Sequence, residues 1–262
     1  MALFHEVVWP FHAVVLAHIA TGSVGLVAFW VPVVAKKGGR SHRTWGKVFT
    51  LSMLVTGSIA VVIASMTIHD PVGTHPGLDF PVPLISGVFG WMMLYLAILT
   101  VNLAWYGWEC IQNRRRHERD RRWLNLLSQL VLLIAAANCL WQGWLLRDYF
   151  LADGRVEPLL MMGISMVGFA TVGTNLWFML RRDPGPQAWL REHLKGLVGA
   201  GISVYTAFLA FGAVRFIPEL ALNPGLWAVP LVTGLAIILY HWRKIWAQEA
   251  RLAALKAGVA RR

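Results

Sequence analysis

The chain of 262 residues is 57% hydrophobic and only 14% charged, and its mean hydropathy is +0.55. A soluble domain carries roughly 45–50% apolar and about 25% charged residues, and a disordered chain is more polar still. The composition therefore excludes both of these classes and indicates an integral membrane protein.

Seven stretches without Asp, Glu, Lys or Arg follow one another along the chain. They are residues 7–35, 48–69, 80–108, 123–146, 158–180, 196–214 and 220–242. About 20 apolar residues of a helix cross a bilayer core of ~30 Å, and lipid offers backbone groups no other partner than the helix itself. The sequence predicts an all-α polytopic protein: a single seven-helix transmembrane bundle over 1–242 and a basic amphipathic cytoplasmic tail over 243–262.

The basic residues alternate between the two sides of these predicted spans. Residues 36–47, 109–122, 181–195 and 243–262 hold 21 of the 24 Lys and Arg residues. The positive-inside rule then places the N-terminus outside and the C-terminus in the cytoplasm, in the inner membrane of a bacterium. Anionic lipid explains the net charge of +11, so we expect the lipid bilayer and no nucleic acid as a partner. The expected lipid headgroup contacts are Arg43, Lys47, Arg121, Arg122, Arg243 and Lys244.

Small residues in the fifth and sixth stretches are spaced for close helix packing. They are Gly163, Gly168, Gly173, Gly196, Gly199, Gly201 and Gly212, and small residues let helix backbones approach one another in lipid. The two cysteines, Cys110 and Cys139, are predicted at depths too different for a disulfide, so we expect both to be packing residues.

No charged residue lies inside any of the seven stretches. Proton relays and charge-driven transporters keep ionisable groups at membrane depth, and a zinc hydrolase needs a carboxylate beside histidine. The chain also lacks the H-E-x-x-H, G-x-S-x-G and P-loop motifs. We therefore predict no catalytic residues, and the sequence leaves open whether the protein is an enzyme.

The nine histidines form two tiers separated by apolar sequence. The outer tier contains His5, His12, His18, His69 and His75, and the inner tier contains His42, His117, His193 and His241. A neutral imidazole is tolerated in lipid and is an axial ligand of haem iron. This pattern predicts a b-type cytochrome with haem b as cofactor, while the sequence defines no other metal. The ligand candidates are His18, His69, His12, His193, His42 and His241.

Two choices of outer ligand stay open. If the turn between the first two spans is centred near Gly39, His12 lies opposite position 66 and within about 5 Å in height of His69. His18 lies about 9 Å deeper than His69. It is followed on the same helical face by Gly22 and Gly25, which would let a flat ring lie against the backbone.

Two stretches carry a pattern that resembles a known family. The first reads His18-x-x-x-Gly22 and then Lys37-Gly38-Gly39-Arg40-Ser41-His42-Arg43-x-x-Gly46. The second reads His193-x-x-x-x-x-Gly199-x-Gly201 and then Thr206-Ala207-Phe208 and Gly212. Over less than half of the chain, they resemble a family of prokaryotic multi-span membrane proteins classed as a domain of unknown function. The resemblance implies that His18, His42, Arg43 and His193 are recurring polar positions, and it does not favour His12 or His69.

Three functions are compatible with these patterns. The first is a haem-binding redox protein, or a subunit of one, that exchanges electrons with a quinone or a membrane redox complex. The second is a non-enzymatic accessory or assembly subunit that holds partners through its Trp-rich and glycine-rich faces. The third is a carrier for metal, haem or a small apolar solute, although the chain lacks the internal repeat that many carriers have.

Overall fold

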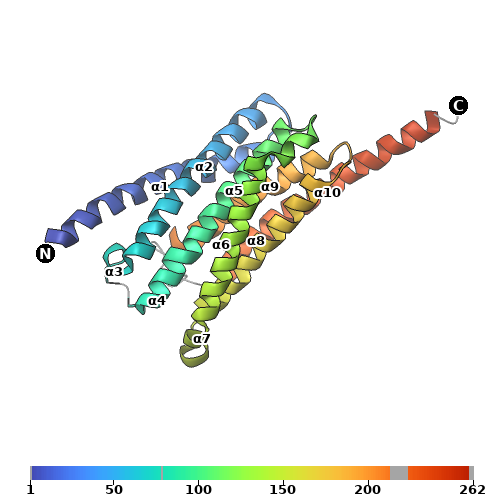
Figure 1. Ribbon diagram of the computed structural model, residues 1–262. Helices are drawn as coiled ribbons and strands as arrows, with labels where there is room; N and C mark the ends of the chain where they lie inside the picture. The colour runs from blue at the N-terminus through green and yellow to red at the C-terminus, as the bar shows by residue number, and fades with distance from the viewer. Residues whose placement is uncertain (1, 78, 213–223, 260–262) are drawn as a thin grey trace. The chain divides into compact units, whose positions relative to one another are not determined.

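The computed structural model describes residues 2–77, 79–212 and 224–259, and every regular element in these ranges is a helix (Figure 1). Within these ranges, five segments are long and apolar enough to cross a membrane: Pro10–Val34, Arg40–His69, Val82–Gln112, Trp123–Asp153 and Glu157–Leu180. These findings confirm the expectation of an all-α protein with helices suited to a bilayer.

These five segments are built from eight labelled elements. They are α1 (Ala2–Val34), α2 (Arg40–His69), α4 (Val82–Ile85), the π-helix η1 (Ser86–Met92), α5 (Met93–Gln112), α6 (Trp123–Leu145), α7 (Arg147–Asp153) and α8 (Glu157–Leu180), with the short α3 (Pro71–Thr74) between α2 and α4.

The expected sixth and seventh spans are helical where the structure describes them. The sixth lies in α9 (Ala188–Ala207) and the π-helix η3 (Phe208–Gly212), and the seventh begins within α10 (Pro224–Val259). Both expected spans, 196–214 and 220–242, also include positions from 213–223, which lie outside the described residues. The count of seven therefore stays a prediction.

The chain divides into two compact units. The first unit contains residues 1–102 and 121–180, and the second contains residues 103–120 and 181–262. The boundary between them falls within α5, after Asn102.

In the first unit, α1 and α2 form an antiparallel hairpin (Figure 1). Phe29 packs on Phe49 with a ring-centroid distance of 5.4 Å, and Gly25 faces Met53. Both pairs are symmetric about position 39, so the predicted centre of the turn is confirmed. Gly38 has a φ of +72°, a left-handed conformation that glycine adopts without a steric penalty.

A second pair of neighbouring helices in this unit consists of α6 and α8. A Cβ built on Gly168 would lie 2.8 Å from Ala136 Cβ and 2.9 Å from the Tyr95 ring. Tyr95 also donates its hydroxyl to the carbonyl oxygen of Ile164 at 2.8 Å. The missing side chain at Gly168 thus makes room for α5 and α6 beside α8, as small residues do in lipid.

The second unit contains the end of α5, the 3₁₀ helix η2 (His117–Arg121) without its last residue, and the helices α9, η3 and α10. The helices α9 and α10 are neighbours, with Gly234 of α10 packed against Ile202 and Val198 of α9. The helix α10 runs without a break from Pro224 to Val259. The described part of the predicted tail is therefore a helical continuation of α10.

Candidate functional site

Two histidines of the α1–α2 hairpin, His18 and His42, are anchored on main-chain oxygens. His18 Nδ1 lies 3.2 Å from the carbonyl oxygen of Thr56, and His42 Nδ1 lies 3.0 Å from that of Pro32. A carbonyl oxygen only accepts hydrogen bonds, so Nδ1 carries the proton in both rings. In the neutral tautomer this leaves a lone pair on Nε2, the form in which histidine ligates a metal.

The second unit repeats this arrangement at His193. Its Nδ1 lies 2.8 Å from the carbonyl oxygen of Gly107 in α5. The three histidines that carry the family resemblance thus share one geometry: an imidazole on one helix donates to the backbone of a neighbouring helix. The geometry is compatible with ligation through Nε2 and also stabilises the helix pairs by itself.

The other outer candidates are more exposed. His69 is the last residue of α2, and His12 lies edge-on to Phe11 with a centroid distance of 5.9 Å. Both side chains are exposed. The symmetry of the hairpin about residue 39 places them near the same end, as predicted, although neither is buried in the protein.

The expected glycine groove beside His18 is closed. A Cβ built on Gly22 would meet Thr56 Cγ2 at 3.4 Å, and one built on Gly25 would collide with the Met53 side chain. The expectation that a flat ring lies against this face is therefore wrong, because α2 itself fills the space that the glycines leave.

The two inner candidates, His193 of α9 and His241 of α10, lie at similar heights along their helices but not on facing sides of them. Gly234 of α10 packs directly on Ile202 of α9, so positions that sum to about 436 lie opposite each other. By this register the two histidines differ in height by only about 3 Å. His193, however, points its Nδ1 at α5.

The described residues contain no group of three or more His, Cys, Asp or Glu side chains that could hold a metal ion. Both cysteines are free and buried, which confirms that Cys110 and Cys139 form no disulfide. A bis-histidine haem site needs only two ligands, so it is not tested by this finding.

The six residues expected to contact lipid headgroups all have exposed side chains. They are Arg43, Lys47, Arg121, Arg122, Arg243 and Lys244. Arg121 also donates from Nε to the carbonyl oxygen of Met179 at 2.8 Å. Their role at the membrane surface stays a prediction.

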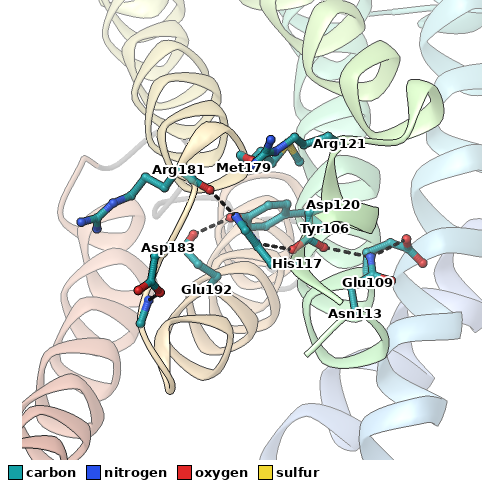
Figure 2. A network of polar contacts seen from close by, with 11 residues as sticks. Tyr106, Glu109, Asn113, His117, Asp120, Arg121, Met179, Arg181, Asp183 and Glu192 are labelled. Atoms are coloured by element: carbon teal, nitrogen blue, oxygen red, sulfur yellow. Dashed lines mark hydrogen bonds and ion pairs between the residues drawn. The ribbon is translucent and has the colours of Figure 1, made fainter. Parts of the chain in front are cut away.

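A polar network that the sequence did not reveal lies in the second unit (Figure 2). Tyr106 donates its hydroxyl to Glu192 Oε2 at 2.5 Å, and Lys195 forms an ion pair with the same carboxylate oxygen. The side chains of Glu192 and Lys195 are 12% and 16% exposed. Together they bring an ammonium, a carboxylate and a phenol into contact between α5 and α9.

The network continues through the segment after α5. Asn113 donates to Asp120 Oδ1 at 2.8 Å, and His117 lies 3.0 Å from Asp120 Oδ2 through Nδ1 and 2.9 Å from the Arg181 carbonyl oxygen through Nε2. The carbonyl oxygen of Arg181 only accepts hydrogen bonds, so Nε2 of His117 donates to it. Burial raises the pKa of Asp120, and its hydrogen bonds with Asn113 and His117 counteract part of this effect.

One sequence signal points to this network. Tyr106, Cys110 and Asn113 are spaced at i, i+4 and i+7, which places them on one face of a helix. All three are buried. The spacing alone does not identify Glu192 and Lys195 as their neighbours, because the α5–α9 contact depends on tertiary packing.

A histidine of the first unit, His75, packs among aromatic rings, and its titration is testable. The ring of His75 lies 4.7 Å from Phe89 and 6.0 Å from Phe11 between centroids. Burial lowers the pKa of His75 below its usual 6.5. The folded state therefore binds this proton more weakly than the unfolded state, and folding loses stability as the pH falls through 6.5 towards the lower folded-state pKa.

We expect the His75→Phe variant to be less sensitive to acid than the wild type. The measurement is the thermal unfolding midpoint of the detergent-purified proteins between pH 7.5 and pH 5. The midpoint of the wild type should fall more steeply across this window, and parallel curves for the two proteins would contradict the assignment.

Comparison of the chain with family models, with curated proteins and with solved structures finds no match. The resemblance carried by His18, His42 and His193 accordingly stays a prediction.

Proposed function

We propose that the protein is an integral membrane haem b protein that exchanges electrons with a quinone or a membrane redox complex. The observation that carries this proposal is the common geometry of His18, His42 and His193, each with Nδ1 held by a backbone carbonyl. Histidines that ligate metals typically donate their other ring nitrogen to such an acceptor. When bound, haem would supply one-electron chemistry, and the surrounding apolar helices would set its potential.

The residues fit haem in donor chemistry and restrict where its ring could lie. The closed glycine face excludes the space between α1 and α2, so a haem on His18 would lie against another face of α1. That helix exposes Leu16, Ile19 and Val27 away from α2, and such side chains suit either lipid or the face of a flat apolar ring.

The proposed topology has seven spans, with the N-terminus outside and the C-terminus in the cytoplasm of a bacterial inner membrane. It is supported by the distribution of Lys and Arg over residues 36–47, 109–122, 181–195 and 243–262. In this orientation the Tyr106–Glu192 contact lies near the cytoplasmic rim, where charged groups reach water more cheaply than at the membrane centre.

An accessory or assembly subunit is the second candidate. It is favoured by the open face of α1, on which Leu16 is 66% and Val27 is 69% exposed. In this case the three anchored histidines serve only to lock helix pairs, and a partner subunit covers the open face of α1. A carrier function has no specific observation in its favour among the described residues.

The absorption spectrum of the purified protein tests the proposal. Expressed with ample haem, the wild type should show a Soret band that shifts on addition of dithionite. His18→Ala or His193→Ala should lower the haem content about tenfold or more, since loss of a ligand costs at least as much as loss of its supporting hydrogen bond.

The matched control is His75→Gln, which changes an outer histidine that is not a ligand candidate and should retain the band. A colourless wild-type protein would overturn the haem proposal, and its recovery within a larger complex would favour the accessory subunit. An unchanged spectrum in both alanine variants would exclude His18 and His193 as ligands.

A further inference from the structure

In the second unit, His117 ties the segment after α5 to the segment before α9 (Figure 2). Its Nδ1 lies 3.0 Å from Asp120 Oδ2, and its Nε2 lies 2.9 Å from the carbonyl oxygen of Arg181. Asp120 in turn accepts a hydrogen bond at Oδ1 from Asn113, at 2.8 Å. Both ring nitrogens of His117 and both carboxylate oxygens of Asp120 are therefore engaged.

These contacts require a proton that His117 and Asp120 hold in common. The carbonyl oxygen of Arg181 only accepts hydrogen bonds, so Nε2 of His117 carries one proton. The contact between Nδ1 and Oδ2 then needs a second proton, on the imidazole of an ion pair or on the carboxyl group of a neutral pair. In both forms the pair holds one proton more than a neutral imidazole and an ionised carboxylate do. We call this additional proton the shared proton.

Loss of the shared proton breaks one of the two contacts of His117. If the remaining proton stays on Nε2, the lone pair of Nδ1 faces an ionised carboxylate oxygen of Asp120 at 3.0 Å. If it moves to Nδ1, Nε2 has no proton to donate to Arg181. Asp120 is 3% exposed and the His117 side chain is 18% exposed, so water replaces the lost hydrogen bond poorly.

The surroundings of the pair favour retention of the shared proton. Charged and titratable groups lie on α5, on η2, on the segment before α9 and on α9 itself; they are Glu109, Cys110, Glu118, Arg119, Arg181 and Glu192. Burial raises the pKa of Asp120, and the negative charge of Glu109 adds to this effect. Arg181 presents its carbonyl oxygen to the imidazole, while its guanidinium points away (Figure 2).

We propose that the His117–Asp120 pair is a proton-operated latch, which holds the segment after α5 on the segment before α9 and releases it as the pH rises above neutrality. In the proposed topology both segments lie on the cytoplasmic side, so the latch responds to the pH of the cytoplasm. It is independent of the haem proposal, because neither residue is a candidate ligand.

The direction of the pH effect follows from the proton count. Above a pH of about 6.5 an ordinary histidine of the unfolded chain has lost its proton, whereas the folded pair retains the shared proton. The folded state then binds more protons than the unfolded state, so the stabilisation is complete below about 6.5 and is lost as the pH rises further.

The mobility of the segment after α5 tests the latch directly. A nitroxide label on Arg115→Cys, an exposed position in the turn before η2, is followed in the detergent-purified full chain between about pH 6 and about pH 9. Both native cysteines, Cys110 and Cys139, are buried, so the label attaches at position 115. The ratio of released to held segment should rise about tenfold across this range, because a hydrogen bond of a charged pair is lost.

Asp120→Asn is the decisive variant, because it keeps the contacts without the shared proton. An asparagine amide at this position donates to Nδ1 of His117 and still accepts from Asn113, so the label should stay immobile at every pH. His117→Phe removes both contacts of the ring and should leave the label mobile throughout. Glu118→Gln, which changes an exposed neighbour outside the pair, is the matched control and should keep the pH dependence.

The unfolding midpoint gives a second measure. Relative to Asp120→Asn at the same pH, the midpoint of the wild type should fall by about 2–4 °C over the same range. A label whose mobility does not change with pH in the otherwise unaltered chain would overturn the latch. A pH dependence that persists in Asp120→Asn would overturn it as well, and this comparison decides alone if His117→Phe does not fold.

Discussion

The Gly196→Ala variant is expected to unfold far more readily than the wild type. A Cβ at position 196 would lie 2.7 Å from both Cα and N of Gly107 and 2.8 Å from the Leu103 carbonyl oxygen. All three are backbone atoms of α5, which cannot move aside as a flexible side chain can. We expect a loss of about 2–3 kcal/mol in the free energy of unfolding, and a larger loss for Gly196→Val.

Gly163→Ala is the matched control for this prediction. Gly163 lies within α8, and a Cβ built there meets no atom within 4 Å. Alanine has the higher helix propensity, so this variant should be up to about 1 kcal/mol more stable than the wild type. Tryptophan fluorescence during thermal unfolding measures both variants, and equal effects at the two positions would contradict the close α5–α9 contact.

Removal of the Glu192 carboxylate is the second change with a large expected effect. In Glu192→Ala, Lys195 loses its ion-pair partner and the Tyr106 hydroxyl loses its acceptor. Because the Lys195 side chain is only 16% exposed, its charge is poorly compensated by water. We expect the free energy of unfolding to fall by about 3 kcal/mol.

A surface ion pair serves as the control for Glu192. Asp148 lies 3.9 Å from Arg147, and its side chain is 76% exposed. Asp148→Ala should change stability by less than about 1 kcal/mol. The double variant Glu192→Leu, Lys195→Met should recover much of the loss, since no charge then remains buried, and a double variant as unstable as Glu192→Ala would argue against an uncompensated Lys195 charge.

The class of protein and one hairpin were accessible from the sequence. The five helices suited to a membrane follow from stretches without charge, and the α1–α2 register follows from the turn centred at Gly39. Both predictions depend on local properties, namely the length of a hydrophobic run and the position of a turn. Such properties depend only on residues that are close together in the sequence.

The faces of the helices were not accessible in the same way. Helices that are apolar all round have no polar stripe to mark the exposed side. The glycine spacing predicts close helix packing at both Gly163 and Gly168, yet of these two only Gly168 lies against a neighbouring helix. For the same reason the sequence predicts a ring-binding groove at Gly22 and Gly25, although this face packs on α2.

The polar side chains of Tyr106, Glu192 and Asn175 were missed for a related reason. Tyr106 and Asn175 lie within long apolar runs, whereas Glu192 lies in the charged stretch 191–195. The partner of each lies on another helix. The spacing within one helix does not identify such partners, so the polar network and the Asn175–Gln129 hydrogen bond emerge only with tertiary structure.

The length of α10 has a mechanical consequence. Its 36 residues extend for about 54 Å, which exceeds a ~30 Å hydrocarbon layer by about 24 Å. Arg191 binds this helix at Trp242 and Glu249, and residues 250–255 beyond that clamp are exposed. A helix held in this way acts as a lever. Leu255 lies six residues, or about 9 Å, beyond Glu249, so a change of about 10° in the inclination of the end of α10 moves Leu255 by about 1.6 Å, to be followed with a spectroscopic label at this position.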